Sequence, residues 1–185
     1  MACVTRRSLL LASVLAGGTL AAGLIARKPR AAAPLAALRV LDPPLPAPDL
    51  VFHDGAGKPV TLAAYRGRGV VLNLWATWCA PCVAEMPALD TLATALAGSR
   101  IAVLAVSTDL GGADVVRRFY AAHHITALPL LLDPDSTAAT ALKVEGVPAT
   151  FLIDPEGRIR GFVQGAQDWA APSAIARVKT LLGGG

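Results

Sequence analysis

Cysteine is scarce in this sequence, which contains three cysteines among 185 residues. Cys3 precedes a long apolar run near the N-terminus, so only Cys79 and Cys82 are available to the rest of the chain. A framework of several structural disulfides is therefore excluded. A bond between Cys79 and Cys82 closes a loop of only about four residues, which constrains an unfolded chain little. We expect this pair to carry chemistry rather than to stabilise the fold.

An excess of positive charge is also missing from the chain after residue 30. The sequence holds 17 Lys and Arg, five of which lie in residues 1–30, leaving 12 against 13 Asp and Glu. The formal net charge of +4 therefore comes from the N-terminal segment. Because the remaining chain has no basic stripe, we expect no nucleic-acid partner. Nor is there a Met-rich or His-rich tract, or an internal repeat.

The two cysteines lie in the octapeptide Trp-Ala-Thr-Trp-Cys-Ala-Pro-Cys at 75–82. Residues 70–75 before the thiols form an apolar run, which is typical of a strand buried on both faces. Residues 80–96 have helical spacing, and Gly98 is suited to end such a helix. The thiols are thus expected where a central strand ends and a helix begins. Free N–H groups and the positive end of the helix dipole favour thiolate over thiol at such a junction.

This placement predicts different roles for the two cysteines. Cys79 at the helix mouth is expected to attack a partner disulfide, and Cys82, one turn further in, to resolve the mixed disulfide. A zinc site is the main alternative for a Cys-x-x-Cys motif, but it needs about four ligands. There is no second such motif, and the other candidate ligands are His53, His123 and His124. We therefore predict a redox pair and no metal.

A second motif, Val-Pro-Ala-Thr-Phe-Leu-Ile-Asp at 147–154, is followed by a turn and strand at 155–159. Together with residues 75–82 and Glu-Met-Pro at 85–87, it resembles the thioredoxin superfamily, specifically its exported TlpA/ResA-like branch. The resemblance runs from about residue 50 to residue 182. It implies an α/β thioredoxin fold, with a central mixed sheet flanked by helices, an N-terminal hairpin and a central insertion. It also implies a protein thiol–disulfide oxidoreductase that uses no cofactor.

The resemblance assigns roles to residues around the thiols. It implies that Pro148 is cis and packs beside the disulfide, and that the backbone of Val147 pairs with the substrate chain. Trp78 is expected to shield the disulfide and to offer a flat contact surface. Glu85 lies three residues after Cys82, so both fall on one helix face, where a carboxyl can handle the proton of the resolving thiol.

Two observations bear on the glutamate. The alternative for Glu85 is a first-turn residue favoured by the helix dipole. Asn73 stands where thioredoxin itself carries a buried aspartate, so that titrating acid is absent from this chain. This departure argues against a general cytosolic thioredoxin.

The remaining elements follow from hydrophobic periodicity and turn signals. We expect a hairpin of residues 50–53 and 58–62, and a second one of residues 150–153 and 159–164. Further strands are predicted at residues 101–107 and 130–132, and further helices at residues 113–123, 137–142 and 170–182.

Three regions divide the chain. Residues 1–30 carry Thr-Arg-Arg-Ser-Leu-Leu, an apolar run and closing basic residues, which predicts an export signal or a membrane anchor. The start resembles a twin-arginine signal. Residues 31–48 are rich in alanine and proline and predict a semi-rigid spacer. Residues 49–185 are predicted to form the thioredoxin-like domain, in the periplasm or another extracytoplasmic space, with membrane contact only through the N-terminal segment.

We therefore expect reduction of specific protein disulfides through Cys79 and Cys82. Apocytochrome c and copper-site assembly proteins are suitable substrates, and the resemblance implies a membrane thiol-electron donor. One alternative is a peroxiredoxin-like peroxidase, but its Thr-x-x-Cys spacing is not that of Thr77 and Cys79. Another is a redox chaperone that binds Cu(I) through the dithiol.

Overall fold

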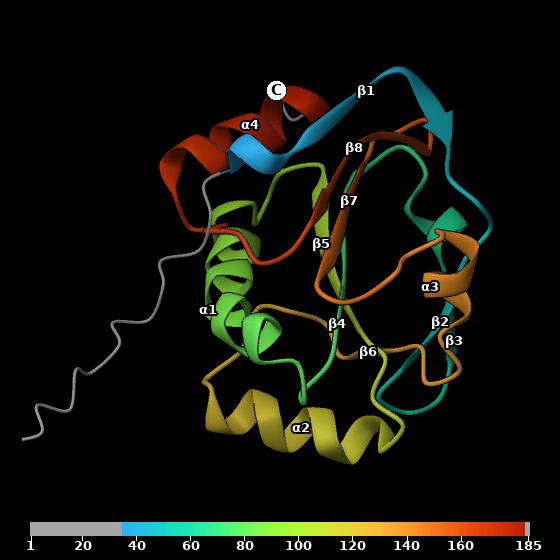
Figure 1. Cartoon of the computed structure of the whole chain (residues 1–185), viewed down its shortest axis with the longest axis vertical. Coiled ribbons are helices and arrows are strands. Elements are labelled where there is room, and N and C mark those ends of the chain that lie inside the picture. Colours follow the sequence, from blue (N-terminus) through green and yellow to red (C-terminus); the bar gives the residue numbers. More distant parts are fainter. Residues whose placement is uncertain (1–34, 184–185) are drawn as a thin grey trace, which may run out of the picture. The chain divides into compact units, whose positions relative to one another are not determined.

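The computed structural model describes residues 35–183. The predicted export signal or anchor, with Cys3, and the first part of the spacer lie outside these residues. Eight strands form one mixed sheet in the order β1-β8-β7-β4-β5-β6-β2-β3 (Figure 1). They are β1 Arg39–Pro46, β2 Val51–Asp54, β3 Pro59–Thr61, β4 Gly69–Trp75, β5 Ile101–Ser107, β6 Leu131–Leu132, β7 Ala149–Ile153 and β8 Arg158–Gln164.

The sheet is parallel at β4–β5 and β5–β6 and antiparallel elsewhere. The helices are α1 Ala80–Ala95, α2 Gly112–Ala122, α3 Thr137–Ala141 and α4 Pro172–Leu182, with 3-10 turns η1 Leu35–Ala37 and η2 Leu62–Tyr65. Each helix and strand predicted from the sequence is present, with ends that differ by at most two residues. This arrangement confirms the predicted mixed α/β sheet flanked by helices.

Strand β4 separates two hydrophobic cores, because its side chains alternate between them. Val71 and Trp75 face the core that contains residues of α1, α2 and α4. Leu72 and Leu74 face the second core, which α3 closes. All seven residues of β4 are buried, as the continuous apolar run predicted. The strand therefore gives the segment with the two cysteines a rigid origin at its carboxyl end.

The predicted spacer extends too far into the chain. Residues 31–48 were expected to be a linker, but Arg39–Pro46 form β1 and pair antiparallel with β8. The register shifts between Val40 and Leu45, across Pro43 and Pro44. Proline is tolerated here because β1 is an edge strand, and a residue that lacks an N–H costs no ladder bond on the open side. Composition indicated extended backbone correctly but gave no sign of this pairing.

Among residues 35–183, no helix is long and apolar enough to cross a membrane.

Candidate functional site

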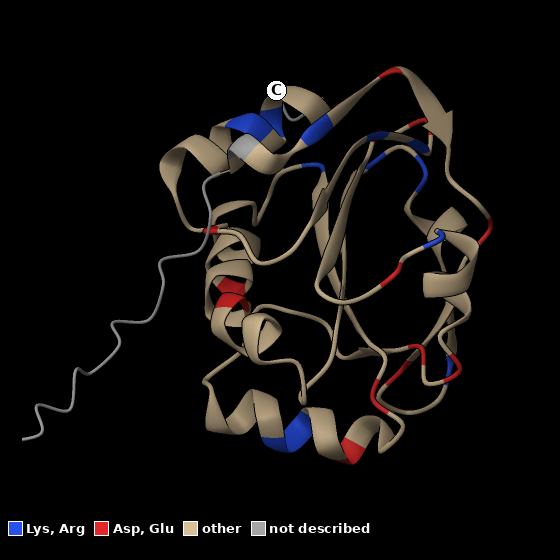
Figure 2. Ribbon diagram, viewed as in Figure 1, with Lys and Arg blue, Asp and Glu red and all other residues tan. Residues whose placement is uncertain are grey.

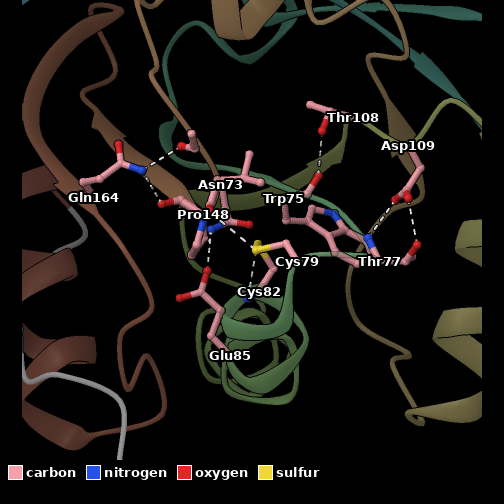
Figure 3. The surroundings of a disulfide bond; sticks show 12 residues. Asn73, Trp75, Thr77, Cys79, Cys82, Glu85, Thr108, Asp109, Pro148 and Gln164 are labelled. Carbon is pink, nitrogen blue, oxygen red and sulfur yellow. Dashed lines mark hydrogen bonds between the residues drawn. A yellow bond between two sulfur atoms is a disulfide. The ribbon is translucent and has the colours of Figure 1, made fainter.

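The disulfide lies where β4 passes into α1 (Figure 3). Cys79 and Cys82 are bonded, with an S–S distance of 2.16 Å. Cys79 is the N-cap of α1, and its sulfur accepts a hydrogen bond from the backbone N–H of Cys82 at 3.3 Å. Pro81 occupies the first turn, where a missing N–H costs nothing. In the reduced protein the same N–H and the helix dipole favour a thiolate on Cys79.

The two sulfurs differ in access to solvent. Cys79 is 5% exposed, whereas Cys82 is completely buried beneath it. Cys79 thus keeps a small exposed fraction at the surface, whereas Cys82 has none. Neither β4 nor α1 contains a Lys or Arg, and the charged residues of α1 are both acidic (Figure 2). Within these two elements, the helix N-terminus is thus the source of positive potential at the thiols.

A loop between α3 and β7 lies against Cys79. The Val147–Pro148 peptide bond is cis, and the carbonyl oxygen of Val147 lies 3.5 Å from the Cys79 sulfur. The side-chain amide of Gln164 donates to the carbonyls of Gly146, at 2.7 Å, and Pro148, at 3.1 Å. The loop is thereby fixed on both sides of Val147, which holds the Val147 carbonyl beside the Cys79 sulfur (Figure 3).

The segment just before Cys79 is fixed by a carboxylate that the sequence reasoning missed. Asp109 accepts hydrogen bonds from the backbone N–H of Thr77, at 2.9 Å, and from its hydroxyl, at 2.7 Å. The hydroxyl of Ser107 also donates to Asp109, at 2.7 Å. A signal was present, because polar residues follow the buried strand β5 and the carboxyl ends of parallel strands meet at one edge. Trp78, on the segment that Asp109 holds, is 72% exposed and available for contact with a partner.

Glu85 is a buried acid in the second turn of α1, with only 1% of its surface exposed. The first turn of α1 contains no acidic residue, so the alternative of a first-turn, dipole-stabilised glutamate is wrong. One carboxyl oxygen accepts from the side-chain amide of Asn73 at 2.9 Å. The other accepts from the backbone N–H of Gln167, at 2.9 Å, and the indole N–H of Trp169, at 3.2 Å.

Burial dominates the acidity of this group. Removal from water disfavours the carboxylate and raises the pKa of Glu85 from its usual value of 4.5 to about 7. The hydrogen bonds from Gln167, Asn73 and Trp169 oppose this rise, because all three donors favour the charged form. A group with a pKa near neutrality can both accept and release a proton under ordinary conditions. The sequence placed Glu85 near Cys82, but its partners 82 and 84 residues away could not be found from spacing.

Asn73 is completely buried on β4 next to Glu85. Its side-chain N–H₂ group donates to Glu85 and also to the hydroxyl of Thr150, at 2.9 Å. The position that the resemblance assigns to a buried acid therefore carries a donor here, and the acid is supplied by Glu85 from α1. Among residues 35–183, no three His, Cys, Asp or Glu side chains lie together in a group suited to a metal ion.

Comparison with known proteins identifies the family of this chain. The sequence profile of the AhpC/TSA family matches residues 44–162. The chain belongs to the AhpC/TSA family. Over 119 residues it is 34% identical to the thiol-disulfide oxidoreductase ResA of Geobacillus thermodenitrificans, covering 64% of this chain and 67% of that protein. ResA of Bacillus subtilis is 33% identical over 119 residues, which cover 64% of this chain and 65% of that protein.

Solved structures of related proteins agree with the observed fold. The exposed lipoprotein thioredoxin Etrx1 of Streptococcus pneumoniae matches with a TM-score of 0.59 and 27% identity, covering 72% of this chain and all of that one. A DsbF homologue from Corynebacterium diphtheriae has a TM-score of 0.65 at 22% identity, covering 79% and 93%, and supports the fold alone. This member of the family has the thioredoxin fold and is a thiol–disulfide oxidoreductase related to ResA.

Proposed function

We propose that this protein is exported from the cytoplasm and reduces specific protein disulfides outside it. Cys79 is the attacking thiol and Cys82 is the resolving thiol. The observation that carries this proposal is the asymmetry of the pair. Cys79 is reachable and caps the helix, whereas Cys82 is completely buried. The first sulfur can thus meet a partner, and the second can act only within the protein.

The reaction proceeds in two exchanges. The Cys79 thiolate attacks one sulfur of the substrate disulfide, forming a mixed disulfide and releasing the first substrate thiolate. The Cys82 thiolate then attacks the sulfur of Cys79, forming the 79–82 disulfide and releasing the second substrate thiolate. Two electrons pass from the protein to the substrate. Glu85 takes up the proton of the Cys82 thiol before the second exchange, a role supported by its position one turn further along α1.

Substrate contact is proposed at Trp78, at Val147 and beside Pro148. The exposed ring of Trp78 offers a flat surface, and the Val147 backbone lies next to the reacting sulfur. A groove of about 480 Å³ is lined in part by Gln164, which holds the Val147 loop, and gives an extended substrate chain room to continue. It is lined by Ala37, Arg39, Lys143, Glu145, Phe162 and Gln164.

The direction of exchange is proposed from the surroundings of Cys79. The dipeptide Ala80-Pro81 between the cysteines lacks the polar histidine of strong oxidants, and β4 and α1 contain no cation that would stabilise the thiolate further. The reduced form is therefore not extremely favoured, which suits a reductant.

Export and partners are proposed from other observations. The twin-arginine-like start lies outside the described residues, and the structural relative from Streptococcus pneumoniae is itself an exposed lipoprotein. The proposed substrates are proteins with cysteine pairs that must be reduced before a metal or haem is attached, such as apocytochrome c or copper-site assembly proteins. The proposed electron source is a membrane dithiol protein.

Replacing Cys82 with alanine tests this function. The Cys82→Ala protein is expected to form a mixed disulfide on Cys79 and to keep it, because no second thiol can resolve it. Export of a tagged variant in its own cell, acid quenching and mass spectrometry identify the captured partners.

The matched control is the Cys79→Ala, Cys82→Ala double variant, which should capture nothing. Capture of secreted or membrane-exposed cysteine proteins supports the proposal. Capture of cytoplasmic proteins alone, or equal capture by the double variant, contradicts it.

A further inference from the structure

Trp169 lies in the segment that joins β8 to α4, far from the active-site motif in sequence. Its side chain is completely buried, and its indole N–H donates to a carboxyl oxygen of Glu85 at 3.2 Å. The backbone N–H of Gln167 donates to the same oxygen at 2.9 Å. A large aromatic side chain thus reaches the acid beneath the redox pair.

The partners of Glu85 are all donors. One carboxyl oxygen receives the Asn73 amide, and the other receives the N–H groups of Gln167 and Trp169. Donors favour the ionised carboxylate, whereas burial favours the protonated acid. A buried carboxylate that lost one donor would be less stable relative to its protonated form and freer to turn. The Trp169 donor is the one that a side-chain substitution can remove without changing either β4 or α1.

We propose that Trp169 is a positioning residue for thiol–disulfide exchange, whose indole N–H holds the Glu85 carboxyl in place and ionised so that it can accept the proton of Cys82. This inference rests on the proton-handling role proposed above for Glu85. It adds a contribution from the β8–α4 segment to a site otherwise built by β4, α1 and the loop before β7.

The groups that face Glu85 come from four elements. Cys82 precedes it by one turn on α1, Asn73 faces it from β4, and Thr150 of β7 reaches it through Asn73. The β8–α4 segment supplies Gln167 and Trp169, and the side chain between them, Asp168, is exposed. In the oxidised protein Cys82 does not titrate, so Glu85 can be followed by itself.

Trp75 provides a matched control within the same protein. It is also completely buried, and its indole N–H has no hydrogen-bond partner among the described residues. It packs on Phe119 and Tyr120 of α2 rather than on Glu85. Replacing Trp75 with phenylalanine therefore removes the same atoms as Trp169→Phe but takes no donor from the acid.

The test is a carboxyl ¹³C NMR titration of Glu85 in the oxidised protein. Trp169→Phe is expected to raise the midpoint by about one pKa unit, a tenfold change in proton affinity, because a donor to a charged group is lost. Trp75→Phe should leave the midpoint where it is in the unsubstituted protein. An unchanged midpoint in Trp169→Phe, or equal shifts in both variants, overturns the inference.

Two further measurements separate the possible failures. In the reduced protein, the pH profile of exchange should move with the Glu85 midpoint. If Trp169→Phe moves the Glu85 midpoint but not the profile, the Trp169 contact stands and the proton-handling role of Glu85 is wrong. If Trp169→Phe does not fold, the inference is tested by following the indole N–H resonance of Trp169 in the unsubstituted protein as the pH changes. It should titrate together with Glu85 while that of Trp75 does not, and a flat Trp169 resonance overturns the inference.

Discussion

Replacing Cys79 with alanine is expected to reduce protein-disulfide reduction to the level of a reaction without the protein. The reason is that, among residues 35–183, no other sulfur is exposed near the site, since Cys82 is completely buried. The measurement is reduction of a test protein disulfide by a limiting dithiol, with and without each variant.

The matched control is Cys3→Ala, which removes a cysteine that lies outside the described residues and precedes Cys79 by 76 positions in the printed sequence. This control should keep full activity. Substantial turnover by Cys79→Ala would mean that Cys82 reaches substrates directly, and the assignment of attacking and resolving thiols would have to be reversed.

Replacing Glu85 with glutamine is expected to remove most of the pH dependence of stability between about pH 4.5 and 7. The folded protein raises the pKa of Glu85 from 4.5 to about 7, so in this window it binds more protons than the unfolded chain. The stability that this group contributes is complete below pH 4.5 and is lost as pH rises through 7. The difference corresponds to about 3 kcal/mol of unfolding free energy.

Denaturant unfolding at pH 4.5, 6 and 8 measures this pH dependence of stability. The oxidised protein is used because its disulfide-bonded cysteines do not titrate. Glutamine resembles the protonated acid, so the variant should be about equally stable at the three values as far as this site is concerned. Glu145→Gln, which changes an exposed glutamate, is the control and should keep the slope of the unsubstituted protein. A Glu85→Gln protein with the same pH slope as the unsubstituted protein would show that Glu85 ionises normally in the fold.

Local sequence patterns were sufficient for the parts of the site that are close together in the chain. The apolar run of β4, the helical spacing of α1 and the two cysteines between them are set by neighbouring residues, and the structure places them as expected. The resemblance added the loop at Val147 and Pro148, whose position next to Cys79 depends on pairing of β7 with β4.

Contacts between distant segments were not predictable in the same way. The prolines of residues 31–48 predict extended backbone and therefore a spacer. They do not indicate that part of this segment forms β1 and pairs with β8. Asp109 and Trp169 reach the site only after β5 and the β8–α4 segment have been brought to it by the sheet. The burial of Glu85 likewise depends on what covers α1, which the spacing from Cys82 does not reveal.

The Cys79–Cys82 pair is proposed to serve as a reductant of protein disulfides. The measurement that tests it most directly is the equilibrium redox potential of the purified protein in glutathione buffers, with the dithiol fraction read by alkylation and mass spectrometry. We expect a potential near the roughly −270 mV of thioredoxin. A value near the roughly −120 mV of the strong oxidant class would contradict it and would make this protein a donor of disulfides.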